Sequence, residues 1–327
     1  MCGNNVINFS GAYCACHNIT GSPVCGNNVS SMNYTFSSCS NLTGYPVCGS
    51  NVVYMYNTYA FCQNLTGSPV CGISVMWMCN TYYNCINLTG NPVCGNSVRN
   101  MVNAYYNCRN LTGAPVCGNK VESMYQTYCW CINLTGSPVC GSNVTSIVNT
   151  YRGCRNLTGS PICGENVINA SNAYYSCQNL TGSPVCGSNV SNMYQMYVDC
   201  WNMTGSPVCG NNVGNMASAY SNCINLTGLP VCGNNVTNMY HTYWNCSNLN
   251  AGTINVYANN ITSFQGCFYN KNNSRRYDIR CYSNSKTFNS LIITNNKSLI
   301  GANIKWTNAG TYHYNTVYNI YIYPDLT

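Results

Sequence analysis

The sequence carries very little charge. Of its 327 residues only 12 are basic and 5 are acidic, so 5% of the chain is charged, against about a quarter in ordinary globular proteins. Disordered chains combine high charge with few aromatic residues, whereas this chain has 29 tyrosines, so we expect a packed core. Long apolar runs are missing too, because Asn, Ser, Thr and Gly interrupt every stretch, which excludes a membrane-spanning helix.

Residues suited to catalysis are scarce and scattered. General acid–base catalysis needs positioned pairs, but the acidic residues and histidines occupy unrelated positions in the chain. No phosphate-binding loop, nucleophile elbow or metalloprotease helix is recognisable. We therefore expect a protein that is not an enzyme and that needs no cofactor. The dispersed residues are Glu122, Glu165, Asp199, Asp278, Asp325, His17, His241 and His313.

The basic residues are few and concentrate beyond residue 250. Arg275, Arg276 and Arg280 are too few for a nucleic-acid-binding face, and no nucleic-acid-binding module is recognisable. Nucleic acid is therefore not an expected partner. No secretory signal peptide is recognisable at Met1, which favours a virion component or a fragment of a larger surface protein.

The chain repeats itself every 23 residues. A Cys-Gly pair recurs at this spacing from Gly26 to Gly233, and a second cysteine series runs from Cys16 to Cys246 without insertion or deletion. Written from Leu42, one unit reads L-T-G-x-P-V-C-G-x-N-V-x-x-M-x-x-x-Y-x-x-C-x-N. Such a unit cannot bury its apolar side alone, so neighbours must stack. The period predicts a repeat solenoid of about eleven 23-residue coils.

Each unit has two halves with different apolar spacing. Leu42, Val47 and Val52 lie in an extended half, which predicts a short parallel β-strand. Met55, Tyr59 and Cys62 are spaced i, i+4, i+7, which predicts a short helical turn with one buried face. The proline in every extended half lacks an amide donor, so we expect the strand ladder to be short.

The repeat resembles a known family. The segment V-T-N-M-Y-H-T-Y-W-N-C-S-N-L at residues 236–249 is similar to the BspA-like leucine-rich repeats of bacterial surface proteins, a repeat type also found in phage tail-fibre and adhesin-type proteins. The resemblance covers residues 2–249 and departs in the extended half, where Ser and Pro replace aliphatic residues. It implies a leucine-rich-repeat-like fold, an extracellular location on a bacterial cell or virion surface, and attachment to a ligand.

The rhythm divides the chain into three parts. Residues 1–249 form the predicted solenoid, whose first coil is truncated, and residues 250–271 form a degenerate terminal repeat. Residues 272–327 form a small β-rich cap or attachment module, because residues 277–282 and 317–323 alternate like strands. The first coil lacks its Leu-Thr-Gly half and a cap, so we expect upstream residues or a second subunit to cover it.

The cysteines permit three interpretations. The series of Cys62 shares a face with Met55 and Tyr59, which predicts buried thiols, whereas the series of Cys48 follows the inward Val47 and is expected to point outward. One cysteine of each series per coil also permits a disulfide inside every coil or between neighbours. No C-x-x-C motif occurs, so we expect no metal site. We favour thiols.

Asn-Leu-Thr recurs in most units, for example at Asn41 and Asn64. The motif is a glycosylation acceptor in a eukaryotic secretory route. Alternatively, stacked Asn and Thr side chains bond to the neighbouring turn and satisfy its backbone groups, which is the interpretation that we favour.

Function is expected where the units differ. Large variable side chains on a rigid frame are of the types that dominate recognition energies. They predict a binding surface for a host-cell or surface receptor, either protein or glycan. The alternative is a self-assembling structural subunit of an extracellular filament or virion fibre, associating through the uncapped N-terminal coil. The candidate ligand-binding residues are Tyr45, Trp77, Arg99, Arg109, Trp130, Arg152, Arg155, Trp201 and Trp244.

Overall fold

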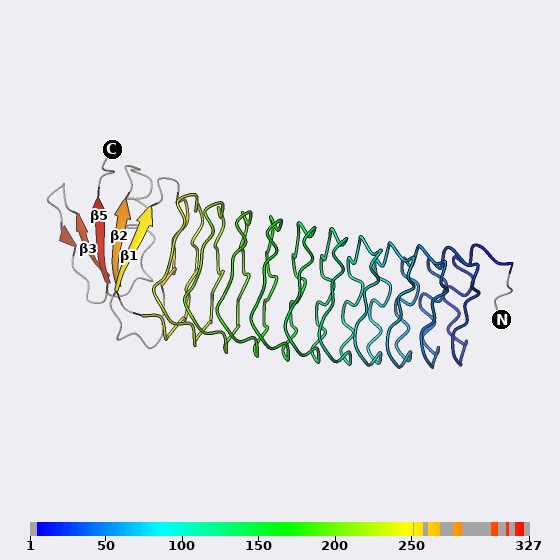
Figure 1. Cartoon of the computed structure of the whole chain (residues 1–327). Coiled ribbons are helices and arrows are strands. Elements are labelled where there is room, and N and C mark those ends of the chain that lie inside the picture. Colours follow the sequence, from blue (N-terminus) through cyan, green and yellow to red (C-terminus); the bar gives the residue numbers. More distant parts are fainter. Residues whose placement is uncertain are drawn as a thin grey trace. The chain divides into compact units, whose positions relative to one another are not determined.

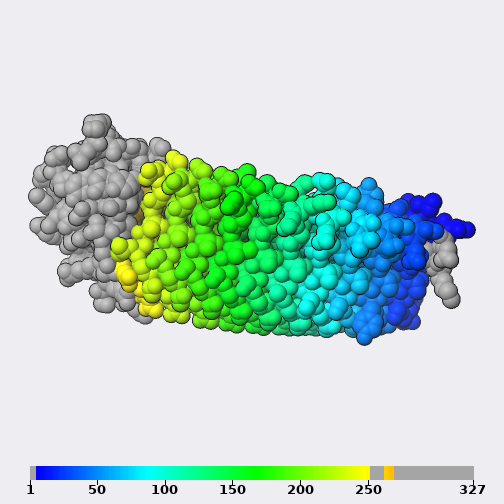
Figure 2. All heavy atoms as spheres, in the orientation of Figure 1, coloured from blue at the N-terminus to red at the C-terminus, as the bar shows by residue number. Residues whose placement is uncertain are grey.

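The chain forms two compact units. The computed structural model describes residues 5–250, 252–257, 261–268, 277–282, 302–306, 312–313 and 318–323. Unit 1 comprises Met1–Val167 with Ser176–Leu180, and unit 2 comprises Ile168–Tyr175 with Thr181–Thr327. Within each unit successive 23-residue coils stack side by side, so each contains a repeat solenoid, as the sequence predicts (Figure 1). The space-filling view shows neighbouring coils in contact along each unit (Figure 2).

The internal structure of the coils differs from the prediction. Residues 5–250 contain neither a helix nor a strand, and each coil contributes a single isolated parallel bridge instead. The bridges run from Asn8 to Ser146 in unit 1 and from Asn169 to Ser263 in unit 2. The expected strand is therefore reduced to one bridging residue per coil, and the expected helical turn is absent from this part of the chain.

Backbone conformation explains why no helix forms at residues 55–62. Asn57 and Phe61 adopt φ values of 51° and 63°, and this left-handed region interrupts a right-handed helix. The main-chain N–H of Tyr59 donates to Thr81 in the next coil at 2.9 Å, whereas that of Cys62 donates to Tyr59 at 3.0 Å. Bonds between coils thus alternate with bonds inside a coil, and the segment is a series of turns.

The core is built from columns, which are sets of side chains 23 residues apart. Val52, Met55, Tyr59 and Cys62 are fully buried, as the apolar pattern predicts. Neighbouring rings of the tyrosine column lie 5.5–5.8 Å apart within each unit and tilt by at most 13°. The column consists of Tyr59, Tyr82, Tyr105, Tyr128 and Tyr151 in unit 1 and Tyr174, Tyr197, Tyr220 and Tyr243 in unit 2.

Tyrosines of this column also join two segments of their own coil. The Tyr59 hydroxyl donates to the carbonyl oxygen of Val47 at 2.6 Å and accepts from the Val47 N–H at 3.0 Å. This hydroxyl clasp satisfies both backbone groups of a residue that follows the buried Pro46. It recurs in the pairs Tyr82–Val70, Tyr105–Val93, Tyr128–Val116, Tyr151–Val139, Tyr197–Val185, Tyr220–Val208 and Tyr243–Val231.

The cysteines from Cys14 to Cys267 are thiols, as we expected. The Cys62 thiol donates to the carbonyl oxygen of Phe36 in the preceding coil at 2.9 Å. The prediction that Cys48 points outward is wrong, because its thiol is half-buried and donates to Gly49 at 3.5 Å. A β-carbon added to Gly72 would lie 3.0 Å from the Cys48 sulfur. Because the glycine after each such cysteine has no side chain, it leaves room for the cysteine sulfur of the preceding coil.

Burial makes these thiols weak acids. Desolvation raises the pKa of Cys62 to about 12 and that of Cys48 to about 11, from an ordinary 9.0. A thiolate is the reactive form of cysteine, so Cys48 and Cys62 stay in the unreactive thiol form at neutral pH.

The Asn-Leu-Thr motifs form the ladder that we favoured. Asn156 donates its side-chain amide to Asn133 at 3.3 Å, and Asn179 donates to Asn156 at 3.4 Å. The Thr66 hydroxyl donates to the Gly44 carbonyl of the preceding coil at 3.3 Å. These side chains satisfy one another and the turns beside them.

Unit 2 also holds a five-stranded sheet. The strands are β1 (Gly252–Tyr257), β2 (Tyr277–Tyr282), β3 (Ala302–Trp306), β4 (Tyr312–His313) and β5 (Tyr318–Tyr323). Their order is β1-β2-β5-β3-β4, with every neighbouring pair parallel except β3 and β4. The alternation noted at residues 277–282 and 317–323 corresponds to β2 and β5.

The repeat continues for one irregular coil next to β1. Ser263 bridges to Asn238, and the Phe268 ring stacks on Tyr243 at 5.5 Å. Ile261 and Phe264 are buried, at the spacing of Val236 and Met239 in the preceding coil. The bounds 1–249, 250–271 and 272–327 stay a prediction. Arg275, Arg276 and Asp325 lie outside the described residues.

Candidate recognition surface

The predicted ligand-binding residues occupy several columns and do not form one cluster. Among the described contacts, the structure brings together two of them, because the Arg152 guanidinium lies 5.9 Å from the centre of the Trp130 ring. A cation over an aromatic face is attracted by about 0.5–1 kcal/mol at an exposed site. This pair orders both side chains at the surface of unit 1.

Three other candidates share one column without being neighbours. Arg109 and Arg155 are both exposed and lie two coils apart in unit 1, and Trp201 takes the same place in unit 2 with 42% of its surface exposed. These three side chains therefore do not contact one another, and they do not form a ligand site by themselves.

Tyr45 and Arg99 have local explanations. The Tyr45 ring is 68% exposed and lies across Gly67, where an added side-chain carbon would fall 1.9 Å from the ring. Gly67 has a φ of 77°, so glycine is needed there for both reasons. Arg99 pairs with Glu122 at 3.2 Å, and an exposed pair of this kind contributes about 0–1 kcal/mol.

A row of aromatic rings adjoins the Trp130–Arg152 pair, and the sequence comparison missed it. Phe61 lies 5.3 Å from Tyr83, and Tyr83 stacks on Tyr106 at 4.7 Å with a 6° tilt. Phe61 shares a column with Trp130, whereas Tyr83 and Tyr106 share the adjacent column with Arg152. Because the row crosses from one column to the adjacent one, a comparison one column at a time does not show the whole row.

Amide side chains fix the polar edge of this row. Asn107 donates to Asn84 at 2.7 Å, and the Arg109 Nε donates to Asn107 at 2.8 Å. What we call the recognition surface consists of Phe61, Tyr83, Tyr106, Arg109, Trp130 and Arg152. Asn84 and Asn107 border it.

The backbone holds the recognition surface in place. Phe61 and Trp130 have left-handed φ values of 63° and 64°, which aim these side chains outward from the turn segment. The N–H of Phe61 donates to Tyr83, and that of Trp130 donates to Arg152, both at 2.7 Å. Phe61 and Trp130 are therefore tied to the next coil, and their backbone positions are determined before any ligand binds.

Smaller aromatic groups lie elsewhere. Tyr56 stacks on Trp77 at 6.3 Å in unit 1. In unit 2 the His241 ring lies 3.8 Å from Tyr240 and 4.2 Å from Trp244. Burial lowers the pKa of His241 from its ordinary 6.5, so this imidazole is neutral at physiological pH.

The Tyr106 hydroxyl of the recognition surface is uncharged. Burial, with smaller contributions from Cys129 and Tyr83, raises the pKa of the Tyr106 hydroxyl, which keeps it a neutral hydrogen-bonding group. Within the described residues, no group of three or more His, Cys, Asp or Glu side chains is placed to hold a metal ion. In the same part of the chain, no helix has the length and apolar character needed to cross a bilayer.

Comparisons with known proteins give remote similarities. A family model for the Kazal-type serine protease inhibitor domain matches residues 12–38 and 172–199, both within the repeat. Among solved structures, the chain is similar to a leucine-rich cell surface protein from Faecalibacterium prausnitzii A2-165, with 14% identity and a TM-score of 0.36 over 68% of this chain and 76% of that one. A search of the curated proteins finds no match.

Proposed function

We propose that this protein is a non-enzymatic recognition protein that acts outside the cell, on a bacterial or virion surface. The observation that supports it is the recognition surface, where aromatic and arginine side chains lie on coils with an ordered backbone. Trp, Tyr and Arg carry most of the binding energy in protein interfaces. A fixed frame lowers the entropy lost on binding.

The composition of this surface favours a receptor of low charge. Tyrosine supplies rigid contact area, and asparagine supplies adaptable hydrogen bonds, as in antibody paratopes. Only Arg109 and Arg152 contribute charge to the recognition surface, so attraction to an anionic partner is a small part of the expected affinity. Binding should therefore change little between low and physiological salt.

Cell binding by a surface variant tests the proposal. We would combine Phe61→Asn, Tyr83→Ser and Trp130→Asn, since other coils hold Asn107 and Ser221 in the same two columns. These substitutions remove the rings without introducing residues foreign to the turn. The matched control is Tyr125→Asn, which replaces an exposed ring outside the recognition surface.

Fluorescently labelled protein would be added to a panel of intact bacterial and eukaryotic cells, untreated or treated with protease or glycosidase. We expect the triple variant to lose at least about tenfold in affinity, or about 1.4 kcal/mol, while Tyr125→Asn binds as the unchanged chain does. The treatments identify a protein or a glycan receptor. Failure of the unchanged chain to bind any cell, or equal binding by the triple variant, would contradict the proposal.

A further inference from the structure

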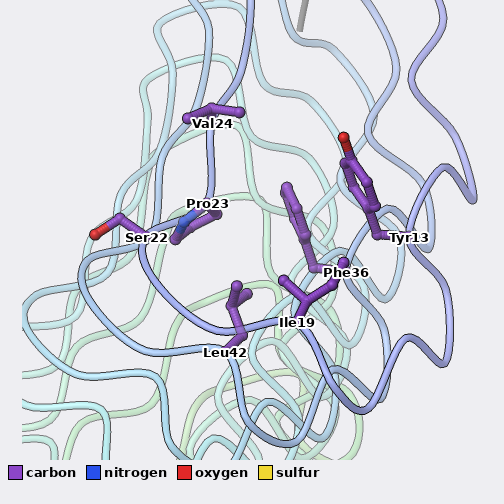
Figure 3. A pocket seen from close by; sticks show the side chains of 7 residues that line it. All are labelled: Tyr13, Ile19, Ser22, Pro23, Val24, Phe36 and Leu42. Atoms are coloured by element: carbon purple, nitrogen blue, oxygen red, sulfur yellow. The ribbon is translucent and has the colours of Figure 1, made fainter. Parts of the chain in front are cut away.

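A cavity of about 170 Å³ lies inside the first coils of unit 1 (Figure 3). Pro23, Phe36 and Leu42 are buried in its walls, and the half-buried Ile19 and the exposed Val24 complete them. The other two lining residues are Tyr13 and Ser22. All of these side chains are uncharged, so the cavity suits a neutral and largely apolar molecule.

The cavity lies in a coil that has phenylalanine, Phe36, at the tyrosine-column position twelve residues after its valine, Val24. Phe36 stacks on Tyr59 at 5.4 Å and so continues the tyrosine column, but it has no hydroxyl. The hydroxyl clasp is therefore missing from this coil. Within the described residues, nothing bonds to the N–H or the carbonyl oxygen of Val24, whereas Tyr59 satisfies both groups of Val47.

The missing group specifies the ligand. In the next coil a phenol hydroxyl both donates to and accepts from the same backbone pair. Val24 is 40% exposed, so water also reaches its backbone groups. A hydrogen bond formed in exchange for one to water is still favourable on balance, so a molecule that brings a hydroxyl to Val24 is favoured over one that does not. An aromatic ring fits the apolar walls, since a cavity of about 150 Å³ lined by Leu, Ile and Phe holds benzene.

We propose that this cavity is a binding site for a small phenol. The ligand ring packs against Ile19, Phe36 and Leu42, and its hydroxyl bonds to the N–H and carbonyl oxygen of Val24 as Tyr59 does to Val47. The site is separate from the recognition surface, whose residues begin at Phe61.

Two matched ligands test the proposal on the unchanged full chain. The probe is p-cresol, and toluene is the same molecule without the hydroxyl. We expect p-cresol to bind at least about tenfold more tightly than toluene in calorimetry, because the hydroxyl forms two hydrogen bonds. Intermolecular nuclear Overhauser effects from the p-cresol ring to the Ile19 and Leu42 methyl groups locate the ligand independently of any variant.

Two substitutions test the role of the missing hydroxyl. Phe36→Tyr restores the hydroxyl clasp and should reduce p-cresol binding to the level of toluene. Tyr105→Phe removes the clasp from a coil away from the cavity, and it should leave p-cresol affinity unchanged. N-acetyltyrosinamide is the third probe, and its binding would identify a tyrosyl side chain, rather than a free phenol alone, as a source of the ligand.

Three results would overturn the proposal: equal affinity for toluene and p-cresol, unchanged p-cresol affinity in Phe36→Tyr, or no p-cresol binding up to its solubility. Cell binding by the recognition surface is measured separately, so either conclusion can fail alone.

Discussion

At the scale of single residues, the tyrosine hydroxyl has the largest structural role. Proline precedes each valine of the clasp, and the bridge that joins coils lies at another position. The valine N–H and carbonyl oxygen would otherwise have to find water inside a narrow coil. The tyrosine side chain thus forms the hydrogen bonds that a neighbouring strand would otherwise form with this valine.

Removing one such hydroxyl should destabilise the chain measurably. Tyr128→Phe leaves the N–H and carbonyl oxygen of Val116 without their partner, and we expect the free energy of unfolding to fall by about 1–3 kcal/mol. Denaturant unfolding followed by circular dichroism measures it. Tyr125→Phe alters a tyrosine of the same coil that is 39% exposed and should change stability by less than about 0.5 kcal/mol. Equal effects of the two substitutions would show that the clasp is not stabilising.

At the scale of the element, the turn segment depends on residues that tolerate left-handed backbone. Asn103 adopts a φ of 53°, and its buried side-chain oxygen has no hydrogen-bond partner. Asparagine is enriched in this region of backbone space, whereas β-branched residues are rare there. This segment therefore carries strain that sequence can adjust.

Substitutions at Asn103 should move stability in opposite directions. Asn103→Gly removes the unpartnered oxygen and the cost of holding a side chain at a left-handed φ, so we expect stability to rise by about 1 kcal/mol. Asn103→Val adds a β-branched side chain at the same φ and should lower stability by about 1–3 kcal/mol. Thermal unfolding of both variants beside the unchanged chain is the measurement. In a right-handed helix valine is more favourable than glycine, so a higher stability of Asn103→Val than of Asn103→Gly would refute this account.

The sequence predicts the repeat length and the core residues better than it predicts the backbone conformation. A 23-residue period and the apolar spacing identify Val52, Met55 and Cys62 as core residues, because burial depends on pattern alone. The spacing i, i+4, i+7 also fits a set of turns, so it does not prove a helix. Asparagine at positions such as Asn57 is a signal of left-handed turns that the prediction did not use.

The candidate site is less predictable, since it depends on contacts between neighbouring coils. Trp130 and Arg152 stand out as large variable residues, but their contact joins two columns. The row of Phe61, Tyr83 and Tyr106 requires the twist and register of the coils, which no single unit contains. Large residues in adjacent columns of successive units are the signal that reveals such a row.

At the scale of the whole molecule, stability should respond very differently to acid and to alkali. Burial raises the pKa of Cys62, Cys71 and Cys209 to about 12 from 9.0. These thiols stay protonated in the folded chain but ionise in the unfolded chain above pH 9, so their contribution is complete below pH 9 and is lost between pH 9 and about 12. Each loses about 1.4 kcal/mol per pH unit in that window.

Acid has few groups to act on. The chain has 5 acidic residues, and the lowered pKa of the half-buried His241 gives a small loss of stability as pH falls below 6.5. We expect the melting temperature at pH 3 to stay within about 10 °C of its value at pH 7, and unfolding at room temperature by about pH 11. Calorimetry from pH 3 to 11 under reductant tests this, and unfolding at the acid end with stability at pH 11 would reverse the argument.

The alternative of a self-assembling fibre subunit stays a prediction about the whole chain. Light scattering and negative-stain electron microscopy of the purified protein distinguish it from the recognition protein. Particles of one defined mass would exclude the fibre, whereas threads of constant width would support it and would leave the recognition surface available for adhesion along the thread.

The constant spacing of the columns has a consequence for how such a chain changes over generations. From Tyr59 onward, the coils of unit 1 meet their neighbours through the same tyrosine, cysteine and asparagine positions. A recombination event that adds or removes 23 codons inside that unit joins two faces that already match. The length of the unit can therefore drift in whole coils while every remaining contact is kept, so related chains should differ by multiples of one coil.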